Sequence, residues 1–319
     1  MKLNQVCLIN PKIQSLLNTL EGQRTAFDLI PVKPELSLSL RRHSLLGSAR
    51  FSASIEGIAG DKGSNKLAIQ NLVKTYIWLY HQQDSVEINL DFIKLLHSSS
   101  HHNLGGDAGQ FRTEQSAIFN SAGVPVYITP PPQEIRPLLT TWQQQIMKSK
   151  QHSVVQAIIS HYQFEKIHPF LDGNGRVGRL ILSQQLRSTG FDFSGLLVLE
   201  EQLDATRNQY YFHLQNEGKD LTPFVEYFLT IMTEAASHVL DKITSTPDAV
   251  TTPHLLPRRQ EILNIITDHS PCSFDFLHRR FMAIPPSTLR YDLLSLQKNG
   301  HIKKLGNTRG ALYSTSPTE

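Results

Sequence analysis

Apolar side chains recur at helical spacing through most of the chain. Residues 65–82 place an apolar side chain at every third or fourth position, and residues 89–98 do the same. The stretch 152–167 carries a similar stripe, made by Val154, Val155, Ile158, Ile159 and Tyr162. Further helices are predicted over residues 12–21, 44–58, 134–147 and in two segments within 196–231. The pattern predicts a mainly α-helical protein.

Two segments depart from helical spacing. Leucine and serine alternate over residues 36–40, which fits a strand, although the same leucines also fit a helix. Residues 111–129 are rich in strand-forming side chains on both sides of the turn signal Ser121-Ala-Gly, and a β-hairpin is therefore predicted there. Pro130-Pro-Pro132 follows as a rigid spacer.

The last 65 or so residues have the pattern of a small separate domain. Threonine, serine and proline over residues 243–257 indicate a linker. Three helices are predicted at 258–269, 273–282 and 286–299, followed by a hairpin wing, so that residues 255–319 are expected to form a winged helix-turn-helix domain.

Charge distinguishes this region from the rest. Residues 251–319 carry nine Lys and Arg against five Asp and Glu, whereas the remainder carries 22 against 23. DNA contact is one interpretation, and packing against protein is the other. Candidate phosphate contacts are Arg290, Lys298, Lys303, Lys304 and Arg309.

Composition otherwise predicts an ordinary cytoplasmic protein. No apolar run approaches the ~20 residues that span a bilayer, and no membrane partner is expected. Cys7 and Cys272 lie far apart and predict reduced thiols rather than a disulfide. His101 and His102 are interpreted as an exposed loop pair, and the glycine-rich stretch after them lacks the pattern of a Walker loop.

The chemistry is concentrated in His168-Pro-Phe-Leu-Asp-Gly-Asn-Gly-Arg-Val-Gly-Arg179. Glycines beside an asparagine allow successive N–H groups to point into one concavity, and the apolar residues that follow predict a helix. A glycine-rich turn at a helix N-terminus is a phosphate-binding geometry. His168 is a candidate base, and Asp172 is a candidate ligand of a divalent cation.

This stretch resembles the signature of the Fic family, H-P-F-x-D/E-G-N-G-R-x-x-R, at every fixed position. The resemblance implies a Fic-type helical bundle with a small β-hairpin flap at 111–129, and transfer of AMP from ATP to a Ser, Thr or Tyr hydroxyl of a target protein. It implies that His168 is the catalytic base and that Asp172 binds Mg²⁺. The implied phosphate-binding residues are Gly173, Asn174, Gly175, Arg176 and Arg179.

A second resemblance lies upstream. Ser52-Ala-Ser-Ile-Glu56-Gly57 is similar to the S/T-x-x-x-E-G/N motif with which some Fic proteins inhibit themselves. A carboxylate paired with Arg179 would occupy the guanidinium that otherwise holds an ATP phosphate. The resemblance therefore implies an inhibitory helix at about 44–58, with Ser52, Glu56 and Gly57 as its motif.

The resemblance also suggests partners and an adenine site. The flap would hold a protein substrate, or the protein itself, by main-chain pairing, and homodimers are common in the family. Tyr210, Tyr211 and Leu214 are candidates for the adenine pocket, with ordinary core packing as the alternative.

The expected layout is an N-terminal helical region at 1–90, a catalytic core at 91–245 and the domain at 255–319. Two other functions remain open. One is removal of AMP, with Glu56 positioning a water molecule, and the other is a DNA-binding regulator that carries a Fic sensor domain.

Overall fold

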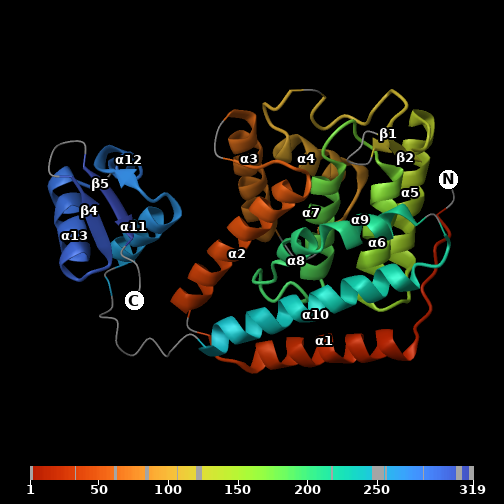
Figure 1. The fold of residues 1–319 in the computed structure, drawn as a ribbon, viewed down its shortest axis with the longest axis horizontal. Helices are drawn as coiled ribbons and strands as arrows, with labels where there is room; N and C mark the ends of the chain where they lie inside the picture. Colours follow the sequence, from red (N-terminus) through yellow and green to blue (C-terminus); the bar gives the residue numbers. More distant parts are fainter. Residues whose placement is uncertain are drawn as a thin grey trace. The chain divides into compact units, whose positions relative to one another are not determined.

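The computed structural model describes residues 3–32, 34–60, 63–82, 86–105, 107–119, 124–216, 218–245, 255, 257–282, 284–306 and 311–315. The chain divides into two compact units, Met1–Ser245 and Thr246–Glu319 (Figure 1). Each unit is described by itself. No described helix is both long enough and apolar enough to cross a membrane.

The first unit is built around α6 (Ser153–Ile167), which is buried at every position from Ala157 to Ile167. Its first part packs into an apolar core with α1 (Pro11–Leu29) and α10 (Thr222–Ser245), which lie side by side in Figure 1. Phe164 and Ile167, near its end, belong to a second core shared with α7 (Asn174–Arg187). Because both cores enclose α6, its polar residues are buried with its apolar ones.

The leucine–serine alternation at 36–40 lies within one long helix, α2 (Pro34–Ile55). The strand interpretation of that segment is therefore wrong. The helix ends at Ile55, and Gly57 follows with φ of +75°, a left-handed conformation that favours glycine. The N–H of Ile58 then donates to the carbonyl of Ala53, which turns the chain and leaves Glu56 at the tip of the helix.

The remaining helices of this unit run longer than, or close to, the predicted ranges. The first predicted helix, 12–21, begins at Pro11, where Asn10 caps the N–H of Ile13, and it continues to Leu29 because its apolar face packs on along α10. The others are α3 (Gly63–Tyr80), α4 (Leu90–Ser100), α5 (Pro132–Lys148), α8 (Leu199–Ala205) and α9 (Arg207–Gln215).

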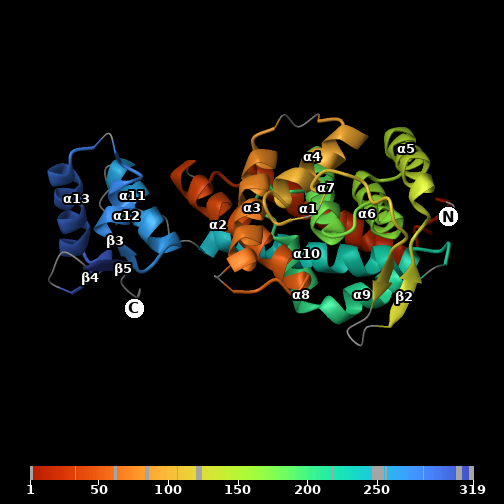
Figure 2. The ribbon, with the colours of Figure 1, turned by 90° about the horizontal axis from the view of Figure 1, so that it is seen from above.

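The predicted hairpin is present as β1 (Ala117–Phe119) and β2 (Pro125–Ile128), which pair antiparallel. Figure 2 shows that it stands outside the helix bundle. The proposed turn residues 121–123 lie outside the described residues. Thr129 closes the base of the hairpin, where its N–H and its hydroxyl both donate to the carbonyl of Ser116.

The described part of the second unit contains the helices α11 (Pro257–Asp268), α12 (Phe274–His278) and α13 (Pro286–Lys298). Its sheet has the order β3–β5–β4, formed by Cys272–Ser273, Leu312–Thr315 and Ile302–Leu305 (Figure 2). The second predicted helix, 273–282, is too long. Ser273 pairs with Leu312 and caps Phe276, so α12 begins after it, and the helix ends at His278. That these elements make a winged helix-turn-helix stays a prediction.

Candidate active site

The stretch from His168 to Gly173 forms a tight loop between α6 and α7. His168 ends α6 with φ of +49°, and Gly173 precedes α7 with φ of +76°. Asn174 holds the loop closed, since its Oδ1 accepts from the N–H of Phe170 at 2.8 Å and its Nδ2 donates to the same residue's carbonyl at 2.9 Å. The amide of Asn174 is thus committed to the loop, and only its backbone N–H remains for a phosphate.

His168 has the protonation state of a base. Its Nδ1 lies 3.2 Å from the carbonyl of Glu165, and because a carbonyl only accepts, Nδ1 carries the hydrogen. Burial lowers the pKa of His168 to about 4, although the Glu165 carbonyl and Glu56 act to raise it. The ring is therefore neutral at pH 7, and its Nε2 is free of a proton.

Asp172 and Arg176 line the first turn of α7. The Asp172 carboxylate accepts from the N–H of Gly173 at 2.6 Å and from Arg176 Nη2 at 2.9 Å, and its side chain is 83% exposed. Arg176 by contrast is 2% exposed, so a buried cation lies directly behind an exposed carboxylate. The N-terminus of α7 and the buried Arg176 guanidinium favour negatively charged groups, whereas the exposed Asp172 carboxylate suits a cation.

Glu56 occupies the same end of α7. Its Oε1 accepts from Arg179 Nη2 at 2.8 Å. It also lies where a side chain at Gly175 would begin, since a Cβ there would be 2.3 Å away. Ser52 completes the contact, because its hydroxyl accepts from Arg179 Nε at 2.9 Å and its carbonyl accepts from Nη2 at 2.8 Å. The structure thus brings the upstream motif and the signature together.

Comparison with known proteins identifies the segment that carries this geometry. Residues 87–186 match the model of the Fic/DOC family. This segment is a Fic domain. It includes the whole signature and the hairpin, and we therefore call residues 111–129 the flap from here on.

Several relatives carry the name protein adenylyltransferase Fic. The protein from Drosophila yakuba is 33% identical over 126 residues, and the one from Drosophila mojavensis is 32% identical over the same length. Each match covers 38% of this chain but only 23% and 22% of the relative, so the chain spans under a quarter of the length of these curated relatives. They share the Fic domain rather than the whole architecture.

Solved structures show the same fold. A Fic family protein from Desulfovibrio desulfuricans G20 matches with a TM-score of 0.63 at 21% identity, over 98% of each chain. Fic-1 from C. elegans matches with a TM-score of 0.61, also at 21% identity, over 73% of each chain. The mainly helical fold with its small hairpin is therefore that of Fic proteins.

The candidate adenine residues lie in three different environments. Tyr210 is 1% exposed, and its hydroxyl is 2.8 Å from His161 Nε2 within the core of the Fic unit. The hydroxyl of Tyr211 donates to the carbonyl of Ile55 at 3.1 Å, so this side chain meets the end of α2. Leu214 packs partly buried against the first core. Tyr210 fits the alternative of core packing, and the adenine site stays a prediction.

Two residues that were not predicted from the sequence as part of the site hold the loop between His168 and Gly173. The first is Arg112. Arg112 donates from its backbone N–H to the carbonyl of Pro169 at 2.9 Å and from Nε to the carbonyl of His168 at 2.8 Å. Its other guanidinium nitrogens donate to the carbonyls of Glu114 and Pro130, at the two ends of the flap. One side chain therefore joins the base of the flap to the loop that begins at His168.

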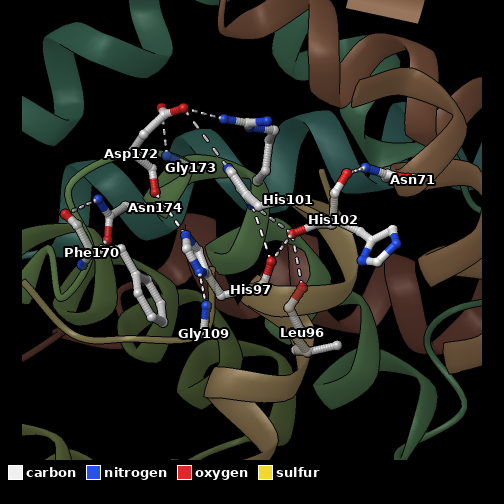
Figure 3. Close-up of polar contacts among 12 residues, drawn as sticks. Asn71, Leu96, His97, His101, His102, Gly109, Phe170, Asp172, Gly173 and Asn174 are labelled. Atoms are coloured by element: carbon white, nitrogen blue, oxygen red, sulfur yellow. Dashed lines mark hydrogen bonds and ion pairs between the residues drawn. The ribbon is translucent and has the colours of Figure 1, made fainter. Parts of the chain in front are cut away.

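The second missed residue is His97, on α4. Its Nδ1 accepts from the N–H of Gly109 at 2.7 Å, and its Nε2 therefore donates to the carbonyl of Asp172 at 3.1 Å. Its ring also stacks on Phe170 with 3.8 Å between centroids. Figure 3 shows these contacts, which tie the glycine-rich loop to the signature.

His101 does not lie in an exposed loop, and that expectation is wrong. It is 4% exposed and stacks on His97 with 4.2 Å between centroids, whereas His102 is exposed as predicted. The two buried rings are four residues apart on consecutive turns of one helix face. The four-residue spacing of His97 and His101 could have predicted that the two rings share one face. Pairing His101 with its neighbour His102 led to the wrong prediction instead.

Glu165 is another buried group beside the signature. Its carboxyl lies against Gly178, where a Cβ would be 2.1 Å from Oε1, and the residue is 7% exposed. Burial raises the pKa of Glu165 to about 8, although Arg179 acts to lower it. A protonated, neutral Glu165 therefore leaves Glu56 as the anionic partner of Arg179.

Proposed function

We propose that the chain transfers AMP from ATP to a hydroxyl of a protein side chain, and that Glu56 holds this activity in check. One observation carries the proposal. A neutral imidazole with a fixed tautomer, His168, stands at the start of a loop that ends in an anion-binding helix N-terminus, and the carboxylate of Glu56 already lies in that position. The curated relatives named protein adenylyltransferase Fic support AMP as the transferred group.

The residues divide the chemistry between them. The N–H groups at the start of α7, together with Arg176 and Arg179, bind the phosphates of ATP and stabilise the leaving pyrophosphate. The attacking hydroxyl oxygen forms a bond to the α-phosphorus as the bond to the β-phosphate oxygen breaks. The hydroxyl proton passes to Nε2 of His168. The products are protein-AMP and pyrophosphate.

The site also suits a divalent cation. Asp172 presents a largely exposed carboxylate beside the phosphate position, and carboxylate and phosphate oxygens are the ligands that Mg²⁺ prefers. The cation would neutralise charge on the phosphates of the substrate. Asp172 would hold the cation through the lone pairs that its contacts with Gly173 and Arg176 leave free.

Labelled ATP tests the reaction type. The Glu56→Gly protein is incubated with ATP labelled at the α-phosphate and, separately, at the γ-phosphate. Label in protein from the α-position alone is expected, because pyrophosphate leaves. Label from the γ-position would mean phosphorylation. Release of label from pre-modified protein in place of incorporation would favour AMP removal.

We propose that the C-terminal unit contacts nucleic acid and that only a few of its basic residues are placed to bind phosphates. Arg258 and Arg259 are committed to the buried Asp292 at 2.6 and 2.8 Å, and Arg290 lies over the ring of Phe274. Exposed lysines remain at 298, 303 and 304, while Arg309 lies outside the described residues.

Binding of duplex DNA should therefore be weak, and about three phosphate contacts predict a slope of log affinity against log salt of about −3. A mobility-shift titration of the full chain at several salt concentrations measures this. Replacement of Lys303 and Lys304 by Ala should lower the salt slope by about two. Binding that ignores salt, or no binding at low salt, would contradict the proposal.

A further inference from the structure

A hollow lies along strand β2 of the flap. Its volume is about 540 Å³, and it is lined by residues 127–131, by Tyr162 and Lys166 of α6, and by residues 4–5 and 218–219. Strand β2 therefore contributes to one wall and α6 to another. Because α6 ends next to His168, the hollow adjoins the segment that supplies the proposed base.

The hollow carries positive charge. Lys166 and Lys219 both line it, and no acidic side chain does so within the described part of the chain. The neighbouring carboxyl groups have other contacts, since Asp220 accepts from the N–H of Thr222 and Glu165 lies against α7. An anion that enters the hollow therefore meets two ammonium groups and, among these residues, no carboxylate that would repel it.

Lys166 is the buried cation of the pair. The residue is 4% exposed, and its Nζ lies 4.0 Å from the ring centroid of Tyr127 and 5.7 Å from that of Tyr162. Both rings line the same hollow, and an aromatic face attracts an ammonium group. A carboxylate that reaches Lys166 from the hollow would form its hydrogen bond in a partly dry setting, where charge-assisted hydrogen bonds are strong.

The position of Lys166 in the chain limits its distance from the proposed base. Consecutive Cα atoms are about 3.8 Å apart, so the Cα atoms of Lys166 and His168 are at most about 7.6 Å apart. In an extended strand, residues i and i+2 point to the same side and lie about 6.4–6.8 Å apart. An extended target segment beside the flap can therefore place a hydroxyl at His168 and a side chain two residues away at Lys166.

We propose that this hollow is a specificity pocket for the target, in which Lys166, assisted by Lys219, binds the carboxylate of an Asp or Glu two residues from the modified hydroxyl. The inference rests on the proposed function, because it names the kind of segment that the flap presents. The contact raises the affinity for acidic segments and takes no part in the transfer itself. Lys166 is thus a specificity-determining residue rather than a catalytic one.

Matched peptides test this preference. Three peptides carry a central threonine and differ only at the positions two before and two after it, which hold Glu, Gln or Lys. The full chain in the Glu56→Gly background is assayed for incorporation of α-labelled AMP, and binding of the fluorescein-labelled peptides is measured separately by fluorescence anisotropy. The ratio between the Glu and Gln peptides is the readout, because a general loss of structure lowers both values and leaves their ratio unchanged.

We expect the parent of this series to prefer the Glu peptide about tenfold, the usual contribution of one hydrogen bond to a charged group. Lys166→Met should remove most of this preference, Lys166→Arg should retain it, and Lys166→Glu should favour the Lys peptide instead. Lys219→Met, at an exposed position, should reduce the preference in part, and it serves should the variants of the buried lysine fail to fold. Lys148→Met is the matched control, because it removes an exposed lysine that does not line the hollow.

The outcomes separate this inference from the proposed function. Equal binding of the Glu and Gln peptides, or a preference that survives in a folded Lys166→Met protein, would overturn the specificity pocket while leaving AMP transfer intact. Absence of binding by the Glu peptide would also overturn it. If neither the peptides nor the protein itself gains label from the α-position, AMP transfer is wrong, and the anisotropy ratios still decide whether the hollow binds acidic segments.

Discussion

Replacement of His168 by Ala is expected to reduce incorporation of AMP into protein by about 10²–10⁴-fold, the usual contribution of a general base. The cause is specific. Because Nδ1 is held by the Glu165 carbonyl, Nε2 is the atom of the ring left to accept the substrate's proton. Binding of ATP, measured by calorimetry in the same variant, should change little, since the proposed phosphate site is formed by α7 and its arginines rather than by His168.

The pH dependence of the labelling rate provides a second test of His168. Its pKa of about 4 means that the neutral base is almost fully populated at pH 7. The rate should therefore stay level from about pH 8 down to pH 6 and fall as the pH approaches 4, where the ring gains a proton. His102→Ala should follow the parent throughout. Persistent labelling by the His168→Ala protein would exclude this histidine as the base.

Replacement of Glu56 by Gly is expected to raise self-labelling roughly ten- to a hundredfold, which corresponds to a coupling of about 1–3 kcal/mol. The carboxylate now pairs with a guanidinium that is 1% exposed and lies against Gly175. Its removal frees Arg179 and clears the position where a phosphate would bind. Incorporation of α-labelled AMP over time, compared with the parent protein, measures the effect.

Two companion variants make this test specific. Glu56→Gly combined with His168→Ala should return labelling to the low level of His168→Ala alone, because release of inhibition cannot replace the base. Ser52→Ala removes one acceptor from Arg179 but leaves the carboxylate, and should raise labelling less than Glu56→Gly. Equal labelling by the parent and Glu56→Gly proteins would mean that the contact does not inhibit.

Much of the fold could be predicted because apolar spacing reports a helix with one solvent face. The stripe from Val154 to Tyr162 placed α6, and the family signature placed the loop after it. The alternation at 36–40 could not be decided from the sequence, because Leu36 and Leu40 are four residues apart and so share a helix face as well as a strand face. In α2 the leucine between them, Leu38, points away and is 63% exposed.

The parts of the site that escaped prediction depend on contacts between distant segments. His101 becomes buried because His97 stacks on Phe170, more than 70 residues later in the chain. Glu165 looks like a surface residue of an amphipathic helix, yet it is buried because α6 is enclosed on all sides. The spacing of His97 and His101 places the two rings on one helix face but does not say that this face is buried, and Glu165 leaves no such mark, so the assembled fold is needed to reveal both environments.

The attachment of the flap has a consequence for how the protein can diversify. Arg112 holds the two ends of the flap and the carbonyl of His168 through main-chain oxygens alone. A residue of any type supplies such a main-chain oxygen. In the proposed function, the side chains of the two strands, and with them the choice of target, would therefore be able to change without moving the loop that begins at His168.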